Sequence, residues 1–150
     1  MKLLVTGGYG FIGSNFILKL LEEHEEFKII NIDAELGGSN PKNLLKINNH
    51  KNYKFVKGNI TNHKLMEELI NECDIVVNFA AESFVDKSIN DATPFLISNI
   101  MGTHTILDII TKQKKRLIQI STDEVYGSLK NTSATEKSIF NPTNPYAATK

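Results

Sequence analysis

The sequence predicts a doubly wound α/β fold, a three-layer arrangement in which a parallel sheet carries helices on both faces. Three observations support this prediction. Five short apolar runs alternate with segments whose apolar residues recur at helical spacing. One of these runs, residues 74–81, is apolar almost throughout, as expected of a strand covered on both faces. Glycines at positions 7, 10 and 13 separate the first apolar run from the first helical segment.

The first strand and helix are predicted close to the N-terminus. The run Leu3–Val5 indicates a buried strand, and Gly7, Gly10 and Gly13 follow it at the spacing G-x-x-G-x-x-G. The next apolar residues recur three and four positions apart, as on one face of a helix; they are Ile12, Phe16, Ile17, Leu20 and Leu21. The order strand, glycine turn and helix is that of a site for nucleotide phosphates.

Two further strands are expected before residue 60. The run Lys28–Ile32 predicts the second strand and is followed by Asp33. A glycine-containing loop comes next, and a short helix is expected from Pro41, because proline is favoured in the first turn. Residues Tyr53–Lys57 alternate between apolar and polar, which predicts the third strand.

The second half of the chain repeats this alternation. Thr61 is expected to cap a helix. The buried stripe of that helix would consist of Leu65, Met66, Leu69 and Ile70. Residues Asp74–Ala81 predict the fourth strand, and residues 83–110 are expected to be helical, with Pro94 beginning the longer segment. The run Leu117–Ser121 predicts the fifth strand.

Composition narrows the class of protein. The 150 residues, 41% of them hydrophobic, provide for one domain with a real core. Seventeen basic and seventeen acidic side chains balance, so no overall field favours nucleic acid or an anionic membrane. The single cysteine, Cys73, excludes an internal disulfide, and no metal site is expected because no cysteine–histidine cluster is present. No signal peptide or membrane-length apolar run is evident, so a soluble, cytoplasmic protein is expected.

The glycine motif and Asp33 together predict a dinucleotide site. Gly7 would allow the tight turn, Gly10 the approach of backbone N–H groups to a pyrophosphate, and Gly13 the close packing of helix on strand. Asp33 lies twenty residues beyond Gly13, where a carboxylate can accept hydrogen bonds from ribose hydroxyls and would repel a 2′-phosphate. NAD is therefore preferred over NADP. The alternative is a purely structural turn followed by an ordinary loop acid.

A hydroxyl and two carboxylates follow the fifth predicted strand, in the segment Ser121–Gly127 (STDEVYG). Ligands of open parallel sheets bind beyond the carboxyl ends of the strands, so Thr122, Asp123 and Glu124 are expected to face the cofactor. They could divide the roles of hydrogen-bond donor, general acid and general base. The alternative is capping chemistry, because Ser or Thr followed by Asp and Glu also begins helices.

Tyr146 and Lys150 form a Y-x-x-x-K pair at the end of the sequence. Residues four apart share one face of a helix, so a phenol and an ammonium would lie side by side. A neighbouring cation favours the phenolate form, which would make the tyrosine usable as a base. Pro142 and Pro145 upstream fit a loop that leads into a helix. The spacing alone also arises by chance.

On these residues the chain resembles an extended short-chain dehydrogenase/reductase, and most closely the group of nucleotide-sugar 4,6-dehydratases that includes dTDP-glucose 4,6-dehydratase. The similarity runs over the whole chain. It rests on the glycines, NFAAES (Asn78–Ser83), STDEVYG (Ser121–Gly127) and YxxxK (Tyr146–Lys150). STDEVYG is the most specific of these motifs, because epimerases and decarboxylases of the same superfamily usually lack the Asp-Glu pair. The resemblance implies a Rossmann fold that binds NAD.

The resemblance also implies a reaction, in which a nucleotide-activated glucose loses water to give a 4-keto-6-deoxy sugar. dTDP-glucose is the first candidate substrate and UDP-glucose the second. Tyr146, helped by Lys150 and Thr122, would take the proton of the C4 hydroxyl while C4 passes a hydride to NAD. Glu124 would then remove the C5 proton and Asp123 would protonate the departing C6 hydroxyl, before the hydride returns to C6.

Further ligand contacts are implied by the resemblance alone. Ser83 and Thr122 would contact the substrate. The residues that would bind NAD are Gly7, Gly10, Phe11, Ile12, Gly13, Asp33, Asn59, Ile60, Phe79, Ala80, Ala81, Ser83, Ser98, Tyr146 and Lys150. A homodimer is implied for the complete protein.

The chain departs from the family pattern at several places. Asn59 stands where the family usually has aspartate, Phe84 where it usually has histidine, and the loop Glu35–Asn40 differs from the usual LTYAGN. Family members are roughly twice as long, so the chain is expected to be the N-terminal part of a longer protein, to lack the substrate domain and to have no dehydratase activity by itself. Two alternatives stay open: an epimerase or decarboxylase of the superfamily, and an NAD-binding module without catalysis.

Overall fold

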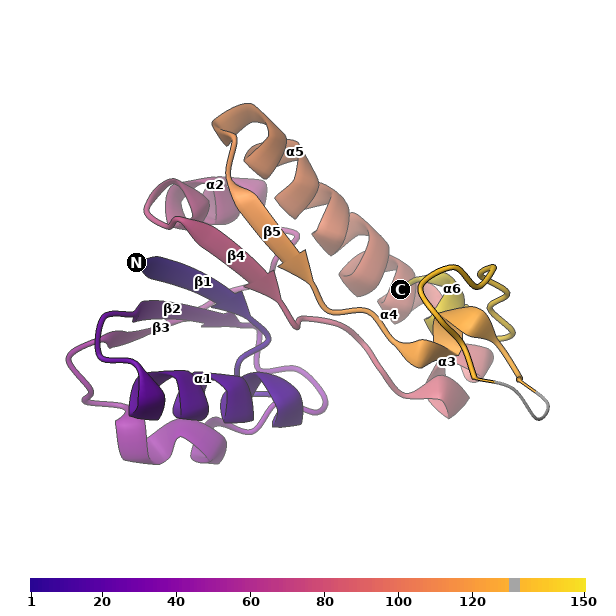
Figure 1. The fold of residues 1–150 in the computed structure, drawn as a ribbon, viewed down its shortest axis with the longest axis horizontal. Helices are drawn as coiled ribbons and strands as arrows, with labels where there is room; N and C mark the ends of the chain where they lie inside the picture. Colours follow the sequence, from indigo (N-terminus) through magenta and orange to yellow (C-terminus); the bar gives the residue numbers. More distant parts are fainter. Residues whose placement is uncertain (130–132) are drawn as a thin grey trace.

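The computed structural model describes residues 1–129 and 133–150, and Figure 1 shows their fold. Five parallel strands form one sheet in the order β3-β2-β1-β4-β5. They are β1 (Lys2–Thr6), β2 (Lys28–Asp33), β3 (Tyr53–Lys57), β4 (Ile75–Asn78) and β5 (Arg116–Gln119). The strand order reverses beside β1, between β2 and β4, which is the kind of position where open α/β sheets bind ligands. The predicted parallel α/β sheet is therefore confirmed.

Helices cover both faces of the sheet (Figure 1). On one side lie α1 (Phe11–Glu23) and the 3₁₀ helix η1 (Pro41–Ile47), and on the other lie α2 (His63–Asn71) and α5 (Thr103–Gln113). Alternate residues of β1 serve the two layers: Leu3 and Val5 pack in the core with Ile17 of α1, and Leu4 packs in the core with Ile106 of α5. All five side chains are buried, so β1 is sandwiched between two separate cores.

The segment between β4 and β5 is less regular than its spacing suggests. It contains α3 (Val85–Asn90), the short α4 (Thr93–Phe95), a π-helical turn η2 (Leu96–Gly102) and α5. The expected helical region over residues 83–110 begins only at Val85 and is interrupted at Asp91, where the chain is extended and the carboxylate accepts the N–H of Thr93. Pro94 lies in the first turn of the second helical stretch, as predicted. The 3₁₀ helix η3 (Asp123–Tyr126) and α6 (Pro145–Ala148) lie near the C-terminus.

Three predicted boundaries need correction. Asn62, rather than Thr61, caps α2, because its side-chain oxygen accepts the N–H of Leu65 at 3.2 Å. Strand β4 ends at Asn78 rather than at residue 81, since the N–H of Ala80 turns to the hydroxyl of Thr6 instead of a strand partner. The fifth strand is shifted and covers Arg116–Gln119 rather than residues 117–121.

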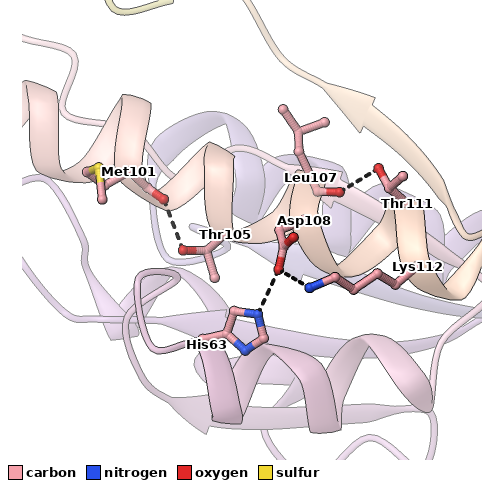
Figure 2. Close-up of polar contacts among 7 residues, drawn as sticks. All are labelled: His63, Met101, Thr105, Leu107, Asp108, Thr111 and Lys112. Carbon is pink, nitrogen blue, oxygen red and sulfur yellow. Dashed lines mark hydrogen bonds and ion pairs between the residues drawn. The ribbon is translucent and has the colours of Figure 1, made fainter.

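An ion-pair cluster joins the two helices on one face of the sheet (Figure 2). The carboxylate of Asp108 on α5 lies 3.0 Å from the His63 ring of α2 and 2.7 Å from the Lys112 ammonium. The hydrogen bonds from Lys112 and His63 hold the pKa of the Asp108 carboxyl below its ordinary value. The cluster is partly exposed, so we assign it a small share of the stability.

Strand β5 lies at the edge of the sheet and pairs with β4 alone within the described residues. Its residues alternate between exposed and partly buried, and the Ile118 side chain is 51% exposed. No helix among the described residues is both long and apolar enough to cross a membrane.

Candidate active site

The glycine turn after β1 is tight enough to require its glycines. Gly7 has a φ of 68°, and a Cβ there would lie 2.7 Å from the backbone of Ala80. A Cβ on Gly13 would lie 2.6 Å from the carbonyl oxygen of Gly7. Gly10 donates its N–H to that same oxygen at 3.1 Å. The turn therefore brings the start of α1 against the end of β1 and against the loop after β4.

The N-terminus of α1 is available to an anion. Gly10 precedes the helix and supplies no side-chain cap, and the first turn holds no acidic residue. The first N–H groups of a helix lack helical partners and carry a partial positive charge. Phe11 and Ile12 in this turn line the cavity described below, and the Phe11 side chain is 80% exposed. This geometry suits the pyrophosphate of a dinucleotide.

Asp33 lies at the end of β2, where its carboxylate organises the neighbouring loop. One oxygen accepts the N–H of Tyr9 at 2.9 Å. The other accepts the N–H of Glu35 at 2.8 Å and the hydroxyl of Ser39 at 2.7 Å. A carboxylate has about four acceptor positions, so three bonds leave it capacity for a ribose hydroxyl. The Ser39 contact was not predicted, and it falls in the loop that departs from the family pattern.

A cavity of about 370 Å³ joins the glycine turn to the C-terminal residues. The structure brings all fifteen residues expected at the cofactor together around it: Gly7, Gly10, Phe11, Ile12, Gly13, Asp33, Asn59, Ile60, Phe79, Ala80, Ala81, Ser83, Ser98, Tyr146 and Lys150. Sequence reasoning did not assign to the site several others that also line it, among them Leu36, Ser39 and Ile120. The cavity lies beyond the carboxyl ends of β1, β2 and β4, as the strand order leads us to expect.

The lining of this cavity fits NAD. A helix N-terminus free of acids lies at one place on its wall and the buried carboxylate of Asp33 at another, matching a pyrophosphate and a ribose. The volume is within the range of ligand pockets. Within residues 1–129 and 133–150, no three His, Cys, Asp or Glu side chains are grouped to hold a metal ion.

Thr122, Asp123 and Glu124 adjoin the cavity without lining it. The segment continues from Ser121, which does line it. The Thr122 hydroxyl accepts the N–H of Glu124 at 3.3 Å and is the N-cap of η3. The capping alternative is therefore realised in the structure, and the same three side chains stay available as chemical groups beside the cavity.

Tyr146 and Lys150 both line the cavity from the C-terminal side. Tyr146 lies in α6, its backbone N–H donates to the Ser88 hydroxyl at 3.1 Å, and its ring packs edge-on against Phe95. The Lys150 ammonium donates to the carbonyl oxygen of Ile120 at 2.8 Å. Burial lowers the pKa of Lys150 from its ordinary value.

Asn99 is a buried polar residue that sequence reasoning missed. It lies in the π-helical turn, next to Ser98 of the cavity wall. Its amide accepts the N–H of Glu82 at 2.8 Å and donates to the Glu82 carbonyl and to the Thr149 hydroxyl at 3.0 and 2.9 Å. One side chain thus joins the cavity loop after β4 to the segment that bears Lys150. A lone asparagine among apolar residues was the available signal.

Comparisons with known proteins agree with this geometry. Residues 4–150 match the family model of GDP-mannose 4,6 dehydratase. The chain is 44% identical to the low-salt glycan biosynthesis protein Agl12 of Haloferax volcanii over 151 residues, covering 100% of this chain and 48% of the relative. The crystal structure of dTDP-glucose 4,6-dehydratase from Bacillus anthracis in complex with NAD superposes with a TM-score of 0.91 at 45% identity, covering 100% of this chain and 47% of that one.

A more distant enzyme shares the same fold. UDP-glucose 4-epimerase from Bifidobacterium longum, in complex with NAD⁺ and UDP, gives a TM-score of 0.89 at 30% identity. The match covers 100% of this chain and 46% of the epimerase. The chain therefore spans about half the length of the relatives it matches.

Proposed function

The chain belongs to the GDP-mannose 4,6 dehydratase family, and we propose that it forms the N-terminal, NAD-binding part of a nucleotide-sugar 4,6-dehydratase. That membership confirms the resemblance noted in the sequence. The observation that carries the proposal is the position of Thr122, Asp123 and Glu124 beside the cavity that Tyr146 and Lys150 line. The substrate domain would lie outside residues 1–150. The substrate would be dTDP-glucose, with UDP-glucose as the second candidate.

The cofactor would occupy the cavity between the glycine turn and Lys150. The N-terminus of α1 would hold the pyrophosphate and Asp33 a ribose, and the remaining lining residues would enclose the rest. Bound NAD would supply a hydride acceptor and later a hydride donor. The exposed apolar side chains of Phe11 and Ile12 would then be covered by the ligand.

The side chains of the chain would move the protons of the reaction. Tyr146, assisted by Lys150 and Thr122, would accept the proton of the C4 hydroxyl of the sugar. Glu124 would remove the proton of C5, which a 4-ketone makes acidic. Asp123 would give a proton to the C6 hydroxyl, which leaves as water and leaves a C5=C6 double bond. The hydride would then return to C6 while Glu124 gives a proton back to C5. One acid and one base are needed beside the Tyr–Lys pair because the reaction both oxidises and eliminates.

The test uses the complete protein with NAD and, separately, dTDP-glucose and UDP-glucose. We expect a 4-keto-6-deoxy sugar, detected by product absorbance after alkali, with the larger rate on dTDP-glucose. No such product from either substrate would contradict the dehydratase proposal. Residues 1–150 assayed alone should give none, because the sugar-binding half would be missing.

Three other functions would give different results. A superfamily epimerase, the class of the structure that is 30% identical to this chain, would return an epimeric sugar that keeps its C6 hydroxyl. A decarboxylase would require a uronic acid substrate. A module that only binds NAD would bind the cofactor and give no sugar product, and the position of Glu124 outside the cavity lining favours that candidate.

Assembly and location are also proposals. We propose that the complete protein is a homodimer, because η2 and α5 expose the apolar side chains of Ile97, Ile100, Met101 and Leu107. Size-exclusion chromatography with light scattering tests it. We place the protein in the cytoplasm, which the single free, buried thiol of Cys73 supports.

A further inference from the structure

The two segments that carry the proposed catalytic groups pack directly against one another. The N–H of Asn141, which lies shortly before α6, donates to the carbonyl of Val125 in η3 at 2.9 Å. Gly127 has a φ of 72°, and a Cβ there would lie 2.2 Å from the carbonyl oxygen of Asn141. The rings of Tyr126 and Phe140 pack in a tilted arrangement, with 5.6 Å between centroids and 45° between ring planes. Backbone contacts and side chains therefore hold η3 and the α6 segment in one arrangement.

Asn144 links these segments through a single amide group. Its side-chain oxygen accepts the N–H of Ala147 at 2.7 Å and so caps α6. Its side-chain nitrogen donates to a carboxylate oxygen of Glu124 at 3.0 Å. A backbone N–H can only donate and a carboxylate can only accept, so the two partners fix which end of the amide faces which.

This double role relates Glu124 to Tyr146. The cap sets the direction of the first turn of α6, and Tyr146 lies in that turn, two residues after Asn144. The hydrogen bond to Glu124 restrains one of its carboxylate oxygens. Asn144 therefore ties the carboxylate to the segment that bears Tyr146, which lines the cavity.

We propose that Asn144 is a positioning residue for proton removal by Glu124, an inference that rests on the proposed dehydratase function. Other residues can cap a helix equally well, and Ser and Asp are among the most favoured. Of these caps, aspartate supplies no donor for a carboxylate, and the serine hydroxyl stands on a shorter side chain than the asparagine amide. Substitution by Asp or Ser can therefore keep the helix cap while it removes the hydrogen bond to Glu124.

The experiment compares Asn144→Asp and Asn144→Ser with the wild-type complete protein. Asn62→Asp is the matched control, because the Asn62 side chain caps α2 through the same contact with the N–H three residues on, and α2 carries none of the proposed catalytic groups. Solvent deuterium entering C5 of the sugar reports on Glu124, and the transient absorbance of reduced nicotinamide reports on oxidation at C4. A ¹³C-carboxyl resonance of labelled glutamate, assigned with Glu124→Gln, reports on the contact itself without turnover. The temperature of thermal unfolding shows whether each substitution weakens its helix cap.

We expect both Asn144 variants to lose about 10²-fold in C5 exchange, since displacement of a catalytic group by about 1 Å costs that much. KM and C4 oxidation should stay near wild type, and the Glu124 resonance should move. Asn62→Asp should change none of these. Wild-type C5 exchange in Asn144→Ser, an unmoved resonance, or an equal fall in exchange and oxidation would overturn the inference alone. A wild-type protein that makes no 4-keto sugar would overturn the proposed function and this inference with it.

Discussion

The Lys150 ammonium donates to the backbone carbonyl of Ile120 across 2.8 Å, which ties the end of the Tyr146 segment to the exit of β5. Both residues line the cavity. The contact compensates the ammonium only in part, because burial still lowers the pKa of Lys150. The position of this lysine therefore costs stability while it fixes a charge at the site.

That cost predicts how stability changes at alkaline pH. The folded-state pKa of Lys150 lies below the unfolded value of 10.5, so between the two values the unfolded chain binds more protons and stability rises with pH. Urea unfolding of the chain and of Lys150→Met from about pH 8 to 10.5 isolates the effect, because other groups titrate equally in both. The free energy of unfolding of the wild type should rise relative to that of Lys150→Met as the pH rises. A difference that stays constant would contradict the prediction.

The glycine turn gives a prediction with an internal control. Gly13→Ala should cost about 1–3 kcal/mol of unfolding free energy, because its Cβ would meet the backbone of Gly7 and Gly8. Gly37→Ala adds a methyl group where no atom lies within 4 Å, and it should stay within about 0.5 kcal/mol of wild type. Urea unfolding at neutral pH measures both. Equal losses would show that the turn tolerates a side chain.

The buried amide of Asn31 predicts a coupling between β2 and β3. It donates to the Tyr53 hydroxyl at 2.9 Å and accepts the N–H of Gly8 at 3.1 Å. Tyr53→Phe leaves that donor buried and unpaired, so we expect a loss of about 1–3 kcal/mol in unfolding free energy. The same substitution in an Asn31→Val background should cost clearly less. Additive losses in this double-mutant cycle would exclude the coupling.

Asp33 predicts the choice between the two nicotinamide dinucleotides. Asp33→Asn keeps an oxygen acceptor and removes the charge that would repel a 2′-phosphate. We expect the ratio of NAD to NADP affinity to fall by about tenfold, or about 1.4 kcal/mol. Titrations of one protein preparation with both ligands give the ratio, which cancels any loss of folded protein. An unchanged ratio would mean that the Asp33 charge does not select the cofactor.

Local sequence predicted the strands well, because strands that are buried on both faces consist of nearly continuous apolar runs. Leu4, Ile30 and Val76 all lie in such runs and pair side by side across the sheet. The helical segments were harder to predict. Thr61 and Asn62 can both cap a helix, and only the fold decides which oxygen meets Leu65. Apolar spacing of three and four also cannot reveal the extra residue of the π-helical turn.

The residues of the site also differ in whether local sequence predicts their role. Gly7, Gly10, Gly13 and Asp33 act through backbone shape and one charge, and both properties follow from nearby sequence. The contact of Asn144 with Glu124 joins residues twenty positions apart. It depends on how the backbone around Gly127 folds back, and no periodicity in the sequence indicates that course. The Asn99 contacts with Glu82 and Thr149 depend on tertiary packing in the same manner.

The edge position of β5 has a consequence for handling the chain in solution. An edge strand presents unpaired backbone N–H and C=O groups that another strand can join. Ile118 places an exposed apolar side chain on that edge strand, whose one charged residue is Arg116 at its start. We therefore expect the solubility of residues 1–150 to be limited by strand addition between molecules, so that light scattering rises with concentration and Ile118→Lys suppresses it.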